Sequence, residues 1–163
     1  MRKVIFFVFV SLLASCAGFS VVSNPKQDKT KVTSKIIDGN WTLESVTHNQ
    51  RGEFEITLLN DTSKECFEGS TWEFTPSNNR GVYNIVKEDC STGERNFVFV
   101  IQRKVESSGY YDFMLKPTNE NYQSEINKGI TLRLAHLSEK TMIWEQTVNA
   151  DGKTFVISMN FVK

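Results

Sequence analysis

The feature that most constrains the fold is an alternation of apolar and other side chains, which recurs eight times after Gly39. A period of two is typical of β-strands with one buried face, because successive side chains point to opposite sides of the sheet. No segment carries the stripe of a long amphipathic helix. The alternation predicts eight strands, at Trp41–Val46, Trp72–Phe74, Val82–Lys87, Phe97–Gln102, Tyr110–Leu115, Ile130–Ala135, Thr141–Gln146 and Thr154–Phe161.

The lengths of the connections predict how these strands are arranged. If each strand pairs with the next, the long connections at Asn49–Ser70, Glu88–Arg95 and Pro117–Gly129 all lie at one end, which we call the rim. We therefore predict an all-β fold, an eight-stranded antiparallel up-and-down β-barrel without a C-terminal helix. A β-sandwich is the competing architecture, and the adjacent hairpins favour the barrel. Phe54–Leu59 also alternates, and is either a ninth strand or a lid element.

One face of the alternation is rich in Trp, Phe, Leu, Ile and Met, as an apolar barrel interior requires. An eight-stranded barrel either fills its interior with side chains or holds one small ligand there. Arg103 falls on the same face, where it would bind a carboxylate or a phosphate. The favoured alternative is that a bulge or the strand end returns Arg103 to solvent. The residues predicted to bind a ligand are Trp72, Phe74, Phe97, Phe99, Arg103, Phe113, Leu132, Trp144, Ile157 and Met159.

The start of the chain predicts export. Two basic residues precede an apolar run, Val4–Ala14, that is too short to span a bilayer comfortably. The run leads into Leu13-Ala14-Ser15-Cys16, which resembles a bacterial lipobox. The resemblance implies that residues 1–15 are a lipoprotein signal peptide, and that Cys16 is lipidated and becomes the new N-terminus. An ordinary secretory signal that is cut nearby is the alternative.

These features predict a lipid-anchored protein of the bacterial cell envelope, facing the periplasm or the cell surface. Ala17 follows the cysteine, where lipoproteins retained at the inner membrane have Asp, so we expect the outer membrane. Residues 16–35 are lysine-rich and polar around Asn24-Pro25, and predict a flexible tether behind the lipidated cysteine. The folded domain is expected at residues 36–163.

Besides Cys16, the chain contains Cys66 and Cys90. An even pair in an oxidising compartment predicts a disulfide. Both cysteines fall in rim connections, so the predicted topology agrees with a bridge between them. Two free thiols are the alternative, and a metal site is disfavoured because no further Cys or His is near either residue in sequence.

Gly39-x-Trp41 at the first strand, the long first loop and the eight-strand meander together resemble the lipocalin family. The closer resemblance is to the lipocalin-like domains of bacterial envelope lipoproteins, and it covers Ile36–Lys163. It implies a barrel in which Trp41 packs across the closed bottom. The chain departs from the family pattern because it lacks a Thr-Asp-x-x-Tyr-like turn and a C-terminal helix.

The sequence offers no pattern that predicts catalysis, a cofactor or a metal site. Lys plus Arg and Asp plus Glu balance at 19 each, which argues against a nucleic-acid partner. The leading hypothesis is a non-enzymatic lipoprotein whose barrel binds a small apolar or amphipathic ligand. The alternative is a filled barrel whose rim loops bind another protein, as an inhibitor or an envelope scaffold. An open interior would favour the first hypothesis, and a filled one the second.

Overall fold

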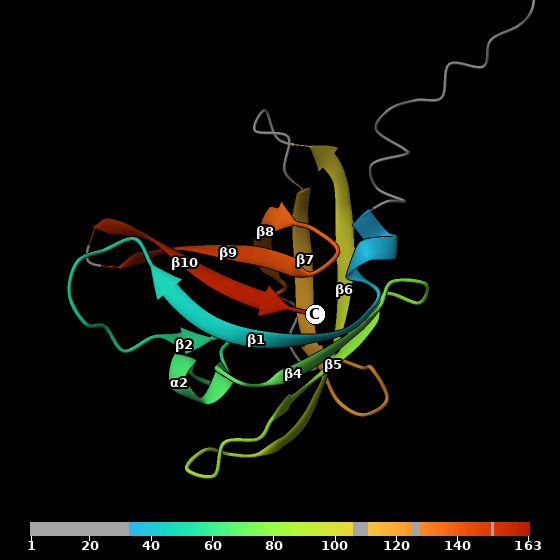
Figure 1. The fold of residues 1–163 in the computed structure, drawn as a ribbon, viewed down its shortest axis with the longest axis horizontal. Coiled ribbons are helices and arrows are strands. Elements are labelled where there is room, and N and C mark those ends of the chain that lie inside the picture. Colours follow the sequence, from blue (N-terminus) through green and yellow to red (C-terminus); the bar gives the residue numbers. More distant parts are fainter. Residues whose placement is uncertain (1–32, 106–110, 125–127, 151) are drawn as a thin grey trace, which may run out of the picture.

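The computed structural model describes residues 33–105, 111–124, 128–150 and 152–163, with residues 103–105 described by their backbone alone. Eight strands close into one barrel in the order β1-β10-β9-β8-β7-β6-β5-β4, and β4 returns to β1 (Figure 1). Every neighbouring pair is antiparallel. The predicted barrel is confirmed, and no helix follows β10 among the described residues. The barrel strands are β1 (Gly39–His48), β4 (Thr71–Thr75), β5 (Arg80–Ile85), β6 (Gly93–Val105), β7 (Tyr111–Thr118), β8 (Ile130–Leu137), β9 (Thr141–Ala150) and β10 (Lys153–Val162).

The closed interior explains the alternation. In β4 the two aromatic residues are buried, whereas Thr71 and Glu73 beside them are exposed. β1 departs from strict alternation, because its pairing with β10 shifts register between Leu43 and Ser45. Such a β-bulge adds one residue to the strand, and Val46 instead of Ser45 becomes the next buried residue.

Strand bounds differ from the prediction mainly at β5 and β6. β5 starts at Arg80 and ends at Ile85, because the chain turns after it. The N–H of Cys90 donates a hydrogen bond of 3.1 Å to the carbonyl oxygen of Lys87 in this turn. β6 begins at Gly93, before the alternation becomes visible, since its first residues pair with β5.

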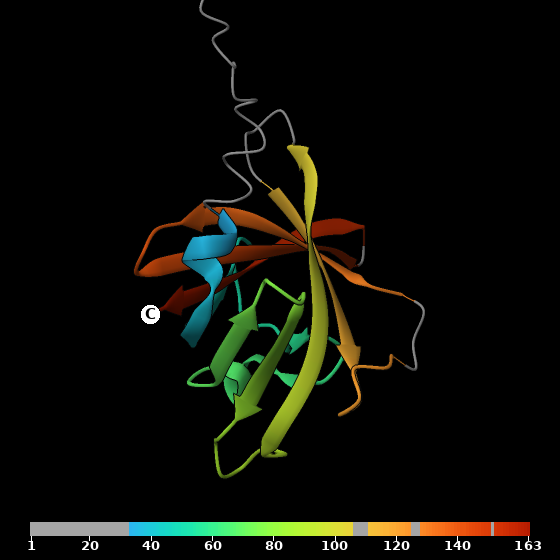
Figure 2. The same cartoon turned by 90° about the vertical axis from the view of Figure 1, so that its right-hand side faces the viewer.

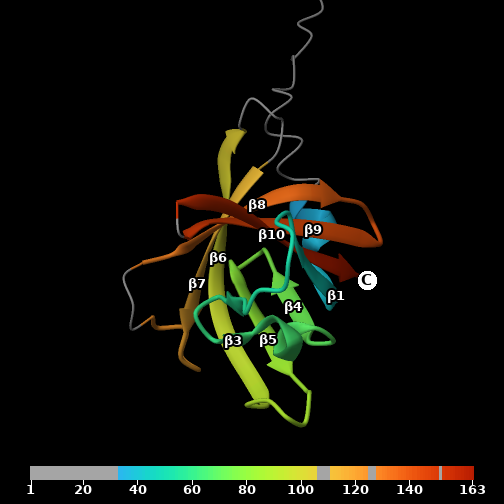
Figure 3. The same ribbon diagram turned by 90° about the vertical axis from the view of Figure 1, so that its left-hand side faces the viewer.

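The long first connection forms small elements of its own at the rim. Thr57–Leu58 (β2) pairs with Thr62–Ser63 (β3), and the short helix Lys64–Phe67 (α2) follows. This two-stranded sheet is separate from the barrel, and it lies beside β4 and β5 (Figure 3). Phe54–Leu59 is therefore not a ninth barrel strand.

The end of the barrel opposite the rim is covered by the chain that leads into β1. Residues 33–37 are helical, and they lie beside the hairpin that joins β8 to β9 (Figure 2). Trp41 Nε1 donates a 2.7 Å hydrogen bond to the carbonyl oxygen of Ile37. Lys163 Nζ donates a 2.9 Å hydrogen bond to the carbonyl oxygen of Ile36, which ties the end of the chain to the same turn. The helix includes the end of the predicted tether, so the folded part starts earlier than the alternation indicates.

Gly81 on β5 is required by a close approach of the Phe97 ring. A Cβ atom at position 81 would lie 2.2 Å from Phe97 Cζ and 2.7 Å from the carbonyl oxygen of Glu73. Because the ring is buried and the carbonyl belongs to a paired strand, we expect Gly81→Ala to lower the free energy of unfolding by about 1–3 kcal/mol. Urea denaturation measures this loss. Gly129→Ala is the matched control, since its Cβ would mainly meet the flexible Met114 side chain. Equal losses in the two variants would contradict the steric explanation.

Candidate functional site in the barrel interior

The nine apolar residues predicted to bind a ligand all lie on the inner face of the barrel. None of them is more than 5% exposed to solvent. They are Trp72 and Phe74 on β4, Phe97 and Phe99 on β6, Phe113 on β7, Leu132 on β8, Trp144 on β9, and Ile157 and Met159 on β10. Their inward orientation agrees with the prediction from period two.

The aromatic members of this set pack against one another. The Trp72 ring centroid lies 4.6 Å from that of Tyr83 and 5.6 Å from that of Phe97. Trp144 lies 5.1 Å from Phe74, edge to face. A ligand would have to displace a neighbouring ring in order to contact these faces. The rings therefore fill this part of the interior, which is the outcome that favours the alternative hypothesis of a filled barrel. We call these packed rings the aromatic cluster.

Other inward side chains carry polar atoms that have no hydrogen-bond partner. Among the described residues, five buried side-chain atoms have no hydrogen-bond partner: Trp144 Nε1, the Tyr111 hydroxyl, Gln146 Oε1, His48 Nδ1, and Thr118 Oγ1 at the end of β7. Such an atom typically costs about 1–3 kcal/mol, so native proteins pair nearly all of them with protein groups or water. The first four of these atoms are covered by surrounding protein atoms, so any partner would have to take the place of a neighbouring side chain.

The strand register places these four side chains on one continuous wall. Trp144 and Gln146 are two residues apart on β9, so they face the same way. Tyr111 and Trp144 both pair with the same residue of β8. His48 and Gln146 both pair with Ile157 of β10. We call this surface, which extends from β7 to β1 and carries Tyr111, Trp144, Gln146 and His48, the polar wall.

The rim end of the interior is covered by residues 53–70, which we call the rim lid. Ile56, Leu58, Leu59 and Phe67 of the lid are buried. The Phe67 ring centroid lies 5.3 Å from that of Tyr83, so the lid packs directly on the aromatic cluster. The alternation over Phe54–Leu59 thus reflects a lid with its own buried side, which was one of the two predicted alternatives.

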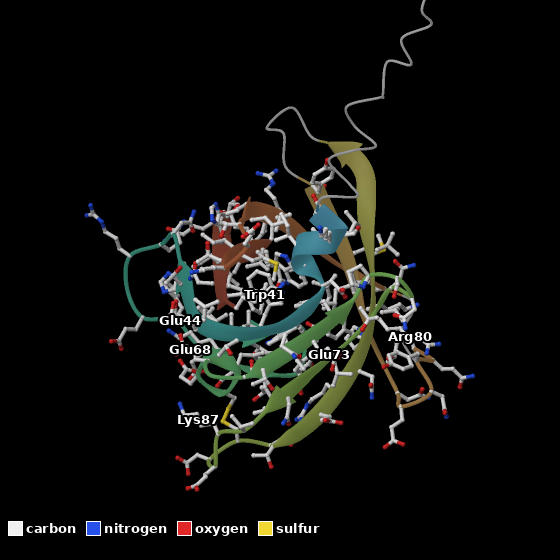
Figure 4. All side chains as sticks on the ribbon, turned by 45° about the vertical axis from the view of Figure 1, so that its right-hand side comes forward. Trp41, Glu44, Glu68, Glu73, Arg80 and Lys87 are labelled. Atoms are coloured by element: carbon white, nitrogen blue, oxygen red, sulfur yellow. A yellow bond between two sulfur atoms is a disulfide. The ribbon has the colours of Figure 1, made fainter. Side chains whose placement is uncertain are left out.

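The predicted disulfide between Cys66 and Cys90 is confirmed. It joins α2 of the rim lid to the loop between β5 and β6, where Figure 4 shows it close to Lys87. Lys87 Nζ donates a 3.2 Å hydrogen bond to the carbonyl oxygen of Glu65, which links the same two segments again. The Glu65 carboxyl accepts hydrogen bonds from the Glu65 backbone N–H and from the Ser63 hydroxyl. These bonds hold the pKa of the carboxyl below its usual value. The lid is therefore fixed to the barrel at α2.

A second attachment of the lid is polar. Asp61 Oδ2 accepts a 2.9 Å hydrogen bond from the Tyr83 hydroxyl and a 3.1 Å bond from Arg95 Nε. The other guanidinium nitrogens of Arg95 donate to the carbonyl oxygens of Gly93 and Ser91, each at 2.7 Å. The cation is thus fully used at the rim, and it is not available to a ligand inside.

Because the Tyr83 phenol is buried, we expect the free energy of unfolding to fall at alkaline pH. Burial, and then the nearby Asp61 carboxylate, raise the pKa of Tyr83 well above its ordinary value. The folded state therefore holds this proton more tightly than the unfolded state. The resulting stability is fully present below about pH 10 and is lost as the pH rises further. Urea denaturation from about pH 8 to about pH 11 should show a steeper loss in the wild type than in Tyr83→Phe. Parallel curves would contradict this coupling.

Arg103 lies where the pairing of β6 with β7 is irregular. The register shifts between Ile101 and Val105, so a bulge or similar irregularity is present there, as the alternative interpretation required. The Arg103 side chain lies outside the described residues. Its role as a ligand anchor stays a prediction.

Two further predicted residues concern the opposite end and the membrane. Trp41 is buried opposite the rim, and Lys163 Nζ lies 5.0 Å from the centroid of its ring. Cys16, the signal peptide at residues 1–15 and the tether up to residue 32 lie outside the described residues. Within the part of the chain that the structure describes, no helix is long and apolar enough to cross a membrane.

Two hollows open on the outer surface near the rim. The first has a volume of about 440 Å³ and is lined by Glu53, Phe54, Glu55, Lys64 and Glu65. The second has a volume of about 380 Å³ and is lined by Glu94, Arg95, Asn96, Thr118, Asn119, Glu120 and Asn121. Neither contains a residue predicted to bind a ligand. Among the described residues, no group of three or more His, Cys, Asp or Glu side chains is arranged to hold a metal ion.

Comparison of the chain with protein-family models, with curated proteins and with solved structures gives no match. The lipocalin resemblance stays a prediction. The barrel itself is shown.

The polar wall includes three residues that the sequence did not single out for ligand binding: His48, Tyr111 and Gln146. Tyr111 and Gln146 lie on faces that the alternation predicts to be inward, so a polar side chain on an apolar face was the available signal. His48 faces inward only because of the β1 bulge, which strict alternation does not reveal.

Proposed function

We propose that the protein is a lipid-anchored binding protein of the bacterial cell envelope, and that its barrel binds a small amphipathic ligand against the polar wall. The observation that carries the proposal is that four of the five buried polar atoms without partners lie on one wall, on Tyr111, Trp144, Gln146 and His48. Hydrogen bonds from a ligand head group would satisfy them once the side chains that cover these atoms move aside, and the apolar residues around them would then bury its hydrocarbon part. Each Å² of apolar area buried would stabilise the complex by roughly 25 cal/mol before the costs of association.

The aromatic cluster has a supporting role in this proposal. Trp144 belongs to both surfaces, since its ring packs on Phe74 and Phe113 while its Nε1 has no partner. The predicted lining residues thus fix the orientation of one hydrogen-bond donor of the wall. The proposed contact surface is shifted from the rings of β4 and β6 toward β7, β9 and β1.

The topology supports a ligand site held away from the anchor. The chain enters β1 through helical residues 33–37, at the end opposite the rim lid, as Figure 1 shows from the places of this helix and α2. A lipid on Cys16 would therefore attach behind the covered end of the barrel. The rim would face away from the membrane that carries the anchor.

Native mass spectrometry of residues 17–163 tests the proposal. This segment omits the predicted signal peptide and lipidated cysteine, and it keeps every described residue. Purified without detergent from a bacterial host, it should carry an added mass that organic solvent removes. A single unliganded mass that neither long-chain alcohols nor fatty acids can shift would contradict ligand binding.

Gln146→Leu separates a binding role from a structural one. Leucine removes a buried oxygen without a partner, so the unliganded variant should be more stable by about 1 kcal/mol. Its affinity for the extracted ligand should fall roughly tenfold, as expected for one lost hydrogen bond. Thermal unfolding and titration measure the two quantities. Thr147→Val, an outward change on the same strand, should leave both unchanged. Lower stability together with unchanged affinity would contradict the role of Gln146.

A protein partner at the rim is the second candidate. It is favoured by the aromatic cluster, which fills its part of the interior, and by an exposed ring on the rim lid. Phe54 is 39% exposed on the rim lid, between Glu53 and Glu55. The lid is fixed by the disulfide, and a preorganised loop loses less entropy when it binds a partner. The Phe54 ring also packs edge to face on His48 and Phe155. If the barrel carries no ligand, Phe54→Leu, which keeps an apolar contact there, should weaken association with the partner more than it lowers the stability of the barrel.

A further inference from the structure

We infer that the outer surface of the barrel carries a binding site for an uncharged saccharide, in the hollow between β6 and the loop that follows β7. The hollow has a volume of about 380 Å³, within the range of roughly 300–1,000 Å³ that is usual for small-molecule sites. Asn96 of β6 and Thr118 of β7 are paired across this hollow, and they alternate with the inward residues of their strands. The site is therefore separate from the barrel interior, and it does not depend on the proposed function.

The described side chains that line the hollow are all polar. Asn96, Asn119 and Asn121 each carry an amide, which both donates and accepts hydrogen bonds. Glu94 and Glu120 add carboxylates, whose two oxygens can each accept from a hydroxyl group. Neighbouring hydroxyl groups of a sugar ring also donate and accept, so this mixture of groups suits them. An apolar ligand would find no apolar side chain to contact.

Most of these groups are available to a ligand. Four lining side chains make no hydrogen bond or ion pair with another described residue: Glu94, Asn96, Glu120 and Asn121. Thr118 Oγ1 is buried and has no partner. Thr118 as a whole is only half-buried and lines the hollow, so rotation about its Cα–Cβ bond can uncover the hydroxyl without moving the strand.

The loop that forms one side of the hollow is already ordered. Asn119 Oδ1 accepts hydrogen bonds of 3.0 Å from the backbone N–H groups of Asn121 and of Gln123. The Arg80 guanidinium lies 4.2 Å from the centroid of the Tyr122 ring, which ties the same loop to the start of β5. A ligand therefore binds without the entropy cost of ordering this loop.

The charges around the hollow argue against a charged ligand. Arg95 is the cation among the described lining residues, and its guanidinium already bonds Asp61, Gly93 and Ser91. An anion would thus meet two carboxylates without a free cation. A lone cation would use the carboxylates and leave the three amides without a role. No described group of three or more His, Cys, Asp or Glu side chains is arranged to hold a metal ion.

Heteronuclear NMR of isotope-labelled residues 17–163 tests the inference. The neutral probes are cellobiose, maltose and N,N′-diacetylchitobiose, and the charged controls are digalacturonate and putrescine. We expect the side-chain amide signals of Asn96 and Asn121 to shift saturably with at least one neutral disaccharide, and to stay in place with both charged controls.

Two variants check that the hollow is the site. Thr118→Val keeps the shape of the side chain and removes its hydroxyl, and Asn96→Ala removes one amide. Each should weaken binding of that disaccharide by about three- to tenfold, as expected for one lost hydrogen bond. Asn40→Ala, the matched change at an exposed position of β1, should keep the affinity.

Each of the other outcomes would overturn the inference. No saturable shift with any of the three disaccharides would show that the hollow binds no uncharged saccharide of this kind. Larger shifts with digalacturonate or putrescine would show that the class of ligand is wrong. Unchanged affinity in both Thr118→Val and Asn96→Ala would show that the sugar binds elsewhere. Shifts confined to interior signals such as the Trp144 indole would place the sugar in the barrel instead.

Discussion

Replacement of Trp72 by alanine is expected to lower the free energy of unfolding by about 3–5 kcal/mol, the usual cost of deleting a large buried aromatic side chain. Trp72 is 1% exposed, and its ring contacts Phe67 of the rim lid as well as Tyr83 and Phe161 of the barrel. The substitution would therefore leave a cavity where the lid meets the aromatic cluster. Urea denaturation followed by circular dichroism measures the loss, since the signal reports strand content without depending on this tryptophan.

Trp72→Phe is the matched control for this prediction. It keeps a ring in the cluster and removes the 2.9 Å hydrogen bond from Trp72 Nε1 to the Ser70 hydroxyl. Its cost should be about 1–2 kcal/mol, because Ser70 is buried and would lose a partner. A loss below about 1 kcal/mol in Trp72→Ala would contradict a filled interior at this position. It would instead support the prediction that the aromatic residues of β4 bind a ligand.

Removal of the disulfide by a double Cys66→Ser and Cys90→Ser substitution should destabilise the protein by about 3–4 kcal/mol. The bridge spans a sequence separation of 24 residues, and closing a loop of that length restricts the unfolded chain by about this amount. Chemical denaturation of the oxidised wild type and the variant gives the difference. Wild type reduced under mild conditions is the control, and it should match the variant.

The folded variant should keep the rim lid in place, because Phe67 and the bonds of Asp61 remain. Trypsin digestion checks this, since Lys64 and Lys87 both lie next to the bridge. A stability loss below about 1 kcal/mol would show that the bridge contributes little to the free energy of unfolding. Rapid cleavage at Lys64 in the native variant would instead show that the disulfide alone holds the lid.

Period two was sufficient to predict the barrel, because each barrel strand buries one face and exposes the other along most of its length. The segments that escaped prediction lack that regularity. The two residues of β2 and the four of α2 are too short to show any period. The helical turn at residues 33–37 is equally short, and its first three residues lie in the polar segment that predicts a tether. Their structure depends on packing against the finished barrel.

The candidate site, too, could be predicted from the sequence only in part. Inward aromatic residues such as Trp72 and Trp144 were predictable, since large apolar side chains on an alternating face have to be buried. Hydrogen-bond satisfaction was not predictable, because it depends on atoms from different strands. Gln146 was expected on an inward face, but nothing in the sequence shows that its oxygen lacks a partner. His48 depends on the bulge after Leu43, which reverses the direction of every later side chain in β1.

The closure of the barrel by β10 has a consequence for how the chain acquires its structure. β10 pairs with β9 on one side and with β1 on the other, and Asn160 bonds Ser45 across 115 residues of sequence. The seam between β1 and β10 therefore cannot form until almost the whole domain has left the ribosome. Until then β1 and β9 each present an open edge, which is prone to pair with other chains. We expect the chain to depend on chaperones during this interval, and shortening at the last strand to cause aggregation instead of a smaller folded domain.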